Sequence, residues 1–186
     1  EDKDFYQHQG VNVINGMARA IKDMVLYHNS LQGGSTITQQ LVKTALLTPE
    51  RTVTRKIKEI ILALLVEKIY SKDQILGMYL NQVPYGGTAW GVEAASEKYF
   101  GKKVNQLDLA QSALLAGLPA APSYYSPFGA RPELAKKRQS EVLGRMREDR
   151  YITKEQEKAA SSEVLNFNLT KEEIKAPHFV MYVKDL

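Results

Sequence analysis

The 186-residue chain has no cysteine, only three histidines and no long apolar run. The absence of cysteine excludes a disulfide framework, a thiolate metal site and a thiolate nucleophile, and it leaves the redox compartment open. The three histidines are too scattered to form a zinc site. The longest apolar run, Ile60 to Val66, is far shorter than the roughly 18 residues that a membrane-spanning helix needs.

The chain also lacks the two common glycine-rich nucleotide loops, Gly-x-x-x-x-Gly-Lys-Ser/Thr and Gly-x-Gly-x-x-Gly. Its basic residues are not interleaved with aromatic residues, so a sequence pI of 9.1 does not by itself indicate a DNA- or RNA-binding protein. We therefore expect no nucleic-acid partner.

Size and composition are ordinary for a soluble globular fold. Hydrophobic residues make up 44% of the chain and charged residues 25%, and the length is sufficient for one domain with a substantial core. No signal peptide is recognisable, and the chain opens in mid-pattern at Glu1-Asp2. We expect it to be a piece of a longer protein.

The net charge of +4 is local. Five basic residues lie between positions 43 and 58 with a single acid, Glu50, while the rest of the chain carries equal numbers of basic and acidic residues. The five are Lys43, Arg51, Arg55, Lys56 and Lys58. Such a concentration favours a site for an anion over a generally basic surface.

Helical signals dominate, and alternating strand patterns are nearly absent. Apolar residues from Val13 to Val25 recur at helical spacing. Helix starts are predicted from Thr36 with Gln39, Thr48-Pro49, Ser71 with Gln74, Thr153 with Gln156, and Thr170 with Glu173. Glycine and proline predict irregular chain at 84–91 and 119–132. The sequence predicts a mainly α-helical domain with at most a short hairpin.

The segment 54–70 is charged at both ends and apolar on nearly every face in between. This pattern is typical of a helix buried through the centre of a domain. Near its start, Glu59 follows Arg55 by four residues and Lys56 by three, so the three share a face. They form either a surface ion pair or, because solvent runs out along the helix, part of a functional site. A carboxylate in the second setting needs partners or a raised pKa.

The turn Gly33-Gly34-Ser35-Thr36 also has two interpretations. It is either a capped helix start after a flexible turn or an anion site, because backbone N–H groups at a helix start attract phosphate. The nearby cations favour an oligophosphate. The apolar stripe from Val13 to Tyr27 similarly packs either on the domain or in a membrane interface. Taken alone, His8 is interpreted as a structural hydrogen-bonding residue.

Five stretches resemble the successive motifs of the peptidoglycan glycosyltransferases, glycosyltransferase family 51. They are EDKDFYQHQG, GGSTITQQLVK, RKIKEIILALLVEKIYSKDQILGMYLNQVPYG, GVEAASEKYFGK and LAQSALLAGLPAAPSYYSPF, in the family's order from Glu1 to Phe128. The ending APHFVMYVKDL is similar to the segment that leads out of this domain in bifunctional class A penicillin-binding proteins.

The resemblance implies a lysozyme-like, two-lobed helical fold with a small membrane-associated jaw lobe and a groove between the lobes. It implies a glycosyltransferase domain at 1–175, with the jaw at roughly 13–50, and at 176–186 the start of a linker toward a C-terminal transpeptidase domain. The implied reaction polymerises lipid II onto a lipid-linked glycan chain with inversion, forms β-1,4 bonds and releases undecaprenyl diphosphate. The implied location is the extracytoplasmic face of the bacterial cytoplasmic membrane, and the implied inhibitor is moenomycin.

Residue by residue, the resemblance makes Glu1 the general base and Glu59 a second carboxylate that assists at the donor diphosphate, directly or through a divalent ion. The positions matching the family's donor site are Ser35, Gln40, Lys43, Arg51, Arg55 and Lys56. A divalent cation, Mg²⁺ or Mn²⁺, at Glu59 is compatible with the resemblance but not required by it. One departure is Gln111, where the family usually has an acidic residue; we expect it on a helix away from the groove.

Two other functions stay open. A lysozyme-like peptidoglycan hydrolase would also need a glutamate in a groove, but it would not need several cations at a diphosphate. A non-catalytic glycan- or membrane-binding module would need neither Glu1 nor Glu59.

Overall fold

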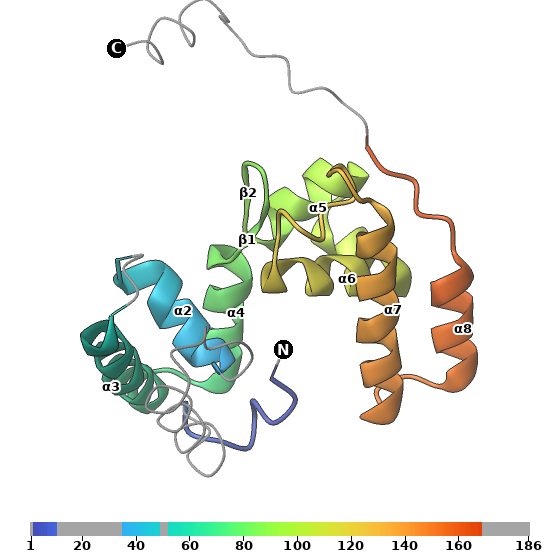
Figure 1. Cartoon of the computed structure of the whole chain (residues 1–186). Helices are drawn as coiled ribbons and strands as arrows, with labels where there is room; N and C mark the ends of the chain where they lie inside the picture. Colours follow the sequence, from blue (N-terminus) through green and yellow to red (C-terminus); the bar gives the residue numbers. More distant parts are fainter. Residues whose placement is uncertain (1, 11–34, 49–51, 169–186) are drawn as a thin grey trace, which may run out of the picture.

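The structure, a computed structural model, describes residues 2–10, 35–48 and 52–168, and the domain is mainly α-helical there (Figure 1). In order, the elements are α2 (Ile37–Leu46), α3 (Val53–Ile69), α4 (Lys72–Gln82), β1 (Pro84–Gly86), β2 (Ala89–Trp90), α5 (Val92–Phe100), the 3₁₀ turn η1 (Val104–Gln106), α6 (Leu109–Gly117), the 3₁₀ turn η2 (Leu118–Ala120), α7 (Glu133–Glu148) and α8 (Lys154–Ser162). The stripe at 13–25, the cap at Thr170 and the proposed linker at 176–186 lie outside the described residues. Of the proposed jaw, only 35–48 is described.

Most of the predicted helix starts are confirmed. Capping boxes open α2 at Thr36, α4 at Ser71 and α8 at Thr153. Helix α3 begins instead with Thr52 as its N-cap, so Thr48-Pro49 does not start it. A further capping box joins Asp108 to Gln111 at the start of α6, which gives Gln111 a structural role on a helix.

The two short strands form the only sheet in the described part of the chain, an antiparallel hairpin with Pro84 opposite Trp90. This agrees with the prediction of at most a short hairpin, but the hairpin lies within 84–91, where the sequence predicted irregular chain. The predicted irregular stretch at 119–132 contains only the end of η2 and turns.

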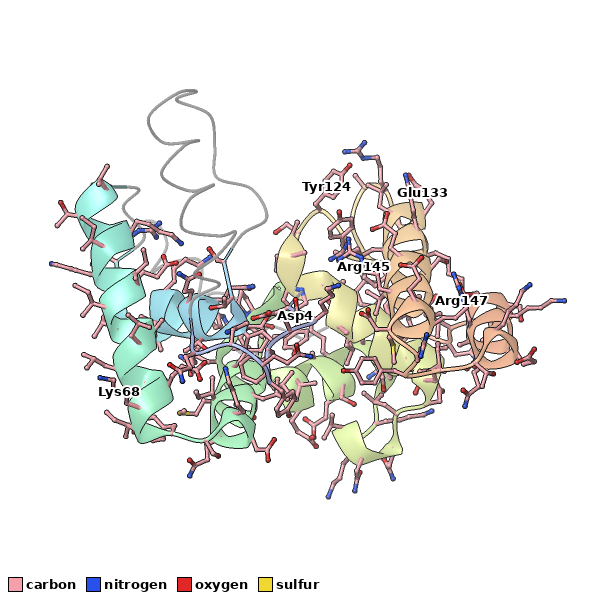
Figure 2. The ribbon with its side chains drawn as sticks, turned by 90° about the horizontal axis from the view of Figure 1, so that it is seen from below. Asp4, Lys68, Tyr124, Glu133, Arg145 and Arg147 are labelled. Carbon is pink, nitrogen blue, oxygen red and sulfur yellow. The ribbon has the colours of Figure 1, made fainter. Side chains whose placement is uncertain are left out.

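The helices form two groups, α2 to α4 and α5 to α8, and both views place the 2–10 segment between them (Figures 1 and 2). The main core joins α2, α4, the hairpin, α5 and α6, with Ile75, Tyr79, Tyr99 and Leu114 fully or almost fully buried. A smaller core packs α6 against α7 and α8 around Leu143. Helix α2 is thus anchored in the main core, and α3 packs against α2.

The prediction that 54–70 is buried through the domain centre is wrong. Only Glu59 and Ala63 of α3 are fully buried, on the side that packs against α2. Apolar side chains along the helix are exposed instead: Val53, Ile57, Ile61, Leu64, Leu65 and Ile69. In Figure 2, α3 runs along one edge of the molecule, and its side chains stand outward. Apolar composition on all faces therefore did not mean burial within this chain. None of the described helices has the length and apolar character required to cross a membrane.

Candidate active site

The start of α2 is built by local hydrogen bonds. The hydroxyl of Thr36 accepts from the backbone N–H of Gln39, and the side-chain oxygen of Gln39 accepts in turn from the N–H of Thr36. The Thr36 hydroxyl also donates to the carbonyl of Gly10 at 2.6 Å. The sequence therefore caps its own helix at this point, and the same cap ties the helix start to the end of the 2–10 segment.

The start of α3 is unusually positive. Thr52 caps it, its first turn has no acidic residue, and the cations Arg55 and Lys56 follow directly. Cations near a helix N-terminus oppose the helix dipole and typically destabilise a helix by about 0.3–1 kcal/mol each. Arg55 Nε is buried and has no hydrogen-bond partner among the described residues. An anionic ligand would relieve both features.

Glu59 is the centre of the site. Its side chain is 1% exposed, and one carboxylate oxygen accepts a very short hydrogen bond from the ammonium of Lys56. The same ammonium donates to the hydroxyl of Ser35 at 3.0 Å. The interpretation as a surface ion pair is therefore wrong, because the carboxylate is removed from water and the pair bridges α3 to the residue before the α2 cap.

The described segment that follows Glu1 is held firmly. The carboxylate of Asp2 contacts Nε2 of His8 at 2.9 Å and accepts from the backbone N–H of Ile37 at 3.1 Å. Phe5 is buried, and Lys72 lies over its ring at 4.5 Å from the centroid. The prediction that His8 is a structural hydrogen-bonding residue agrees with this pair.

The structure brings some of the predicted donor-site residues together and separates others. Ser35, Lys56 and Glu59 form one bonded cluster, and Gln40 joins it because its Nε2 donates to the Ser35 carbonyl at 3.3 Å. Lys43 is exposed in the last turn of α2. At 1.5 Å of rise per residue, it lies about 12 Å along the helix from Ser35. Glu1 and Arg51 lie outside the described residues.

The described residues do not form a metal centre at Glu59. No group of three or more histidine, aspartate or glutamate side chains in residues 2–10, 35–48 and 52–168 could hold an ion. The Glu59 carboxylate is moreover already bonded to a cation, Lys56, which competes with a metal for the same oxygen. We therefore assign no chemical step to a metal, and binding of Mg²⁺ or Mn²⁺ at Glu59, which the resemblance allows but does not require, stays a prediction.

Sequence reasoning missed three residues of this region. Asp2, Thr38 and Glu67 each have a buried or nearly buried side chain that bonds to a residue about 30 positions away. The sequence carries only a weak indication of a role for these residues: Asp2 is adjacent to Glu1, and Glu67 follows Glu59 by about two helical turns. Neither spacing names the partner.

Comparison with known proteins identifies the family of this chain. Residues 1–147 match the family described as Transglycosylase. The chain is 40% identical to penicillin-binding protein 1F of Bacillus subtilis over 98% of this chain and 25% of that protein. It is 43% identical to penicillin-binding protein 1A of Escherichia coli over 99% of this chain and 22% of that protein. It is 45% identical to penicillin-binding protein 1A of Aquifex aeolicus over 99% of this chain and 25% of that protein.

A solved structure is also similar. The crystal structure of penicillin-binding protein 1A from Haemophilus influenzae gives a TM-score of 0.54 at 29% identity, over 84% of this chain and 20% of that one. The chain thus spans about a quarter of the length of the curated relatives it matches. These findings confirm the resemblance drawn from the motifs: the chain belongs to the transglycosylase family and is an enzyme domain similar to parts of penicillin-binding proteins 1A and 1F.

Proposed function

We propose that this domain polymerises lipid II into β-1,4 glycan strands with inversion at the donor sugar. The acceptor's 4-hydroxyl oxygen attacks C1 of the donor MurNAc. Its proton passes to a carboxylate base, and the bond from C1 to the diphosphate oxygen breaks to release undecaprenyl diphosphate. A single displacement of this kind needs no covalent nucleophile.

One observation carries the proposal: a buried carboxylate, Glu59, fixes the ammonium of Lys56 against Ser35 beside a helix start without acids. Departure of a diphosphate develops negative charge, and cations held in place stabilise that charge better than mobile water does. Lys56 neutralises the charge of Glu59 in this pair. Arg55 and the positive end of the α3 dipole then stay available to bind the donor diphosphate.

The roles follow from this arrangement. Glu1, next to the anchored Asp2, is the base for the acceptor hydroxyl. Glu59 holds Lys56, and the donor diphosphate and sugar are bound by the remaining family positions: Ser35, Gln40, Lys43, Arg51, Arg55 and Lys56. Moenomycin would occupy the same donor site. We also propose that the fold is lysozyme-like, with a small membrane-associated jaw lobe.

The membrane is the second partner that we propose. The exposed apolar residues of α3 (Val53, Ile57, Ile61, Leu64, Leu65 and Ile69) form a row that water does not favour. A lipid-linked substrate requires the enzyme to work at a bilayer, here the extracytoplasmic face of the cytoplasmic membrane. In the whole protein, a C-terminal transpeptidase domain would follow the linker.

A hydrolase or a binding module is the competing proposal. The cation-rich start of α3 argues against a hydrolase, since cutting a finished glycan releases no diphosphate. Labelled lipid II separates these functions: we expect polymer from the unaltered domain and at least a hundredfold less from Glu1→Gln or Glu59→Gln. Glu141→Gln on α7 is the matched control, because the side chain of Glu141 pairs with Arg138 on the same helix, which carries none of the predicted site residues. Digestion of finished glycan without polymer formation would favour the hydrolase.

A further inference from the structure

A second carboxylate lies on the same side of α3 as Glu59. Glu67 follows Glu59 by eight residues, and its side chain is 7% exposed. One of its oxygens accepts from the hydroxyl of Thr38 at 2.5 Å and from the ammonium of Lys72 at 2.8 Å. Glu67 therefore joins α3 to α2 through Thr38 and to α4 through Lys72.

The first turn of α2 is consequently fastened to α3 at two places. Ser35 bonds to Lys56 near the start of α3, and Thr38 bonds to Glu67 about three turns later. The completely buried Ala63 lies between these points. Two attachments along α3 fix both where α2 crosses it and how α3 is rotated, whereas the Lys56 attachment alone would leave the rotation free.

The 2–10 segment ends on the same surface. Gly10 has a φ of +76°, and a Cβ placed there would come within 2.7 Å of Glu67 Cγ and 3.0 Å of the Ala63 carbonyl oxygen. The segment is held at a second point as well, since Lys72, the ion partner of Glu67, also covers the ring of Phe5. Glu67 therefore touches the segment that follows Glu1 directly and through Lys72.

We propose that Glu67 is a positioning residue for the glycosyl transfer, an inference that rests on the proposed function. It sets the register of α3 against α2 and the 2–10 segment, so that Glu59 and Lys56 face Ser35 and the segment that follows Glu1 is held against α3. We assign Glu67 no contact with the reacting atoms, because its buried carboxylate is bonded to Thr38 and Lys72, and eight residues of helix place it about 12 Å from Glu59 along the axis.

The kinetic test uses variants that preserve shape. Glu67→Gln keeps the acceptor oxygen but removes the charge, and Thr38→Val removes only the hydroxyl bond. We expect each to lower kcat for lipid II polymerisation about 10- to 100-fold with KM changed less than about threefold, since an ångström of misplacement has effects of that size. Thr38→Ser, which restores a hydroxyl, should recover most of the rate, and Glu141→Gln should match the parent.

The double variant Glu67→Gln/Thr38→Val supplies a further discriminator. If the two side chains act as one unit, it should lose hardly more activity than either single variant. Unchanged kcat in Glu67→Gln, equal losses in Thr38→Ser and Thr38→Val, or a raised KM with unchanged kcat would each overturn the positioning role.

A readout without substrate separates this inference from the proposed function. Amide hydrogen exchange of the intact chain should become faster in residues 2–10 and at the start of α2 in Glu67→Gln, with α7 and α8 unchanged. If the parent makes no polymer, the proposed function fails, and the exchange result alone decides whether Glu67 sets the register. Unchanged exchange in both segments would overturn the inference, whatever the activity.

Discussion

The carboxylate of Asp2 accepts a hydrogen bond from the backbone N–H of Ile37 at 3.1 Å, although the two residues are 35 positions apart. Ile37 is the first residue of α2, so its N–H has no partner within the helix. Asp2 thus acts as a long-range cap, and its negative charge lies at the positive end of the helix dipole. The residue beside the proposed base is therefore attached to the helix that carries Ser35 at its start.

We predict that Asp2→Asn weakens this attachment. Losing the charge at the helix start and at His8 should lower the free energy of unfolding by about 1–2 kcal/mol, and polymerisation should fall with it. Urea unfolding and the lipid II assay measure the two effects. Asp4→Asn is the matched control in the same segment, because the Asp4 side chain has no hydrogen bond or ion pair with another described residue. Equal effects of the two changes would contradict a special role for Asp2.

The Lys56–Glu59 pair predicts a divergence between stability and activity. Lys56→Met leaves the carboxylate of Glu59 buried without its cation, which should destabilise the fold by about 3–5 kcal/mol. Combining it with Glu59→Gln should restore most of that stability but none of the activity. Thermal unfolding and the polymer assay on the two single variants and the double variant test this. A double variant as unstable as Lys56→Met would show that the charge pair is not what Lys56 contributes.

Lys56 also gives a ligand prediction. If its ammonium lies in the donor site, Lys56→Met should bind moenomycin at least tenfold more weakly, because a charge-assisted contact to phosphate is lost. A fluorescent moenomycin derivative in a competition assay measures this. Lys158→Met on α8 serves as the control, since that lysine lies in the helix packed on α7. Unchanged affinity in Lys56→Met would remove this residue from the donor site.

Burial of Tyr85 predicts a loss of stability in alkali. Desolvation raises the pKa of Tyr85 from 10.0 to about 12 in the folded state. Below pH 10 the phenol is neutral in both states and its contribution is complete. Between pH 10 and 12 the unfolded chain loses the proton first, so the free energy of unfolding falls by about 1.4 kcal/mol per pH unit. Urea unfolding from pH 9 to 11.5 should show a shallower decline in Tyr85→Phe; the same slope in both proteins would contradict the prediction.

The exposed row on α3 predicts membrane binding that mutation can weaken without unfolding. Ile57 and Ile61 are 53% and 52% exposed, so replacing both with glutamate should change stability little. Sedimentation with anionic phospholipid vesicles should show at least a tenfold loss of binding. Val164→Glu, at an exposed apolar position beyond α8, is the control. Equal binding by all three proteins would rule out this face as the membrane contact.

Local features of the fold were predictable from the sequence because they depend on residues three or four apart. Thr36 with Gln39 predicts the start of α2, and Ser71 with Gln74 predicts the start of α4. Both predictions succeed because all the hydrogen bonds of a capping box lie within one helical turn. The choice between Arg55 and Lys56 as the partner of Glu59 was not predictable, because both spacings place the residues on one face. In the structure the partner is Lys56, whose ammonium also donates to the hydroxyl of Ser35.

The remainder depended on contacts far apart in the sequence. Nothing near Glu67 indicates Thr38, 29 residues away, and nothing near Asp2 indicates Ile37. The exposure of α3 was misjudged for a related reason. An apolar pattern records that a surface avoids water, but it does not say whether protein or something else covers that surface.

Helix α3 sets a fixed spacing between its two attachments to α2, one at Lys56 and the other at Glu67. Its outward positions can exchange one apolar residue for another. Inserting or deleting one residue between Lys56 and Glu67 would instead rotate one attachment by about 100° around the helix axis relative to the other. Chimeras that exchange segments with related enzymes should therefore tolerate joints before Thr52 or after Ile69. A joint that changes the number of residues between Lys56 and Glu67 should yield a folded chain without polymerising activity.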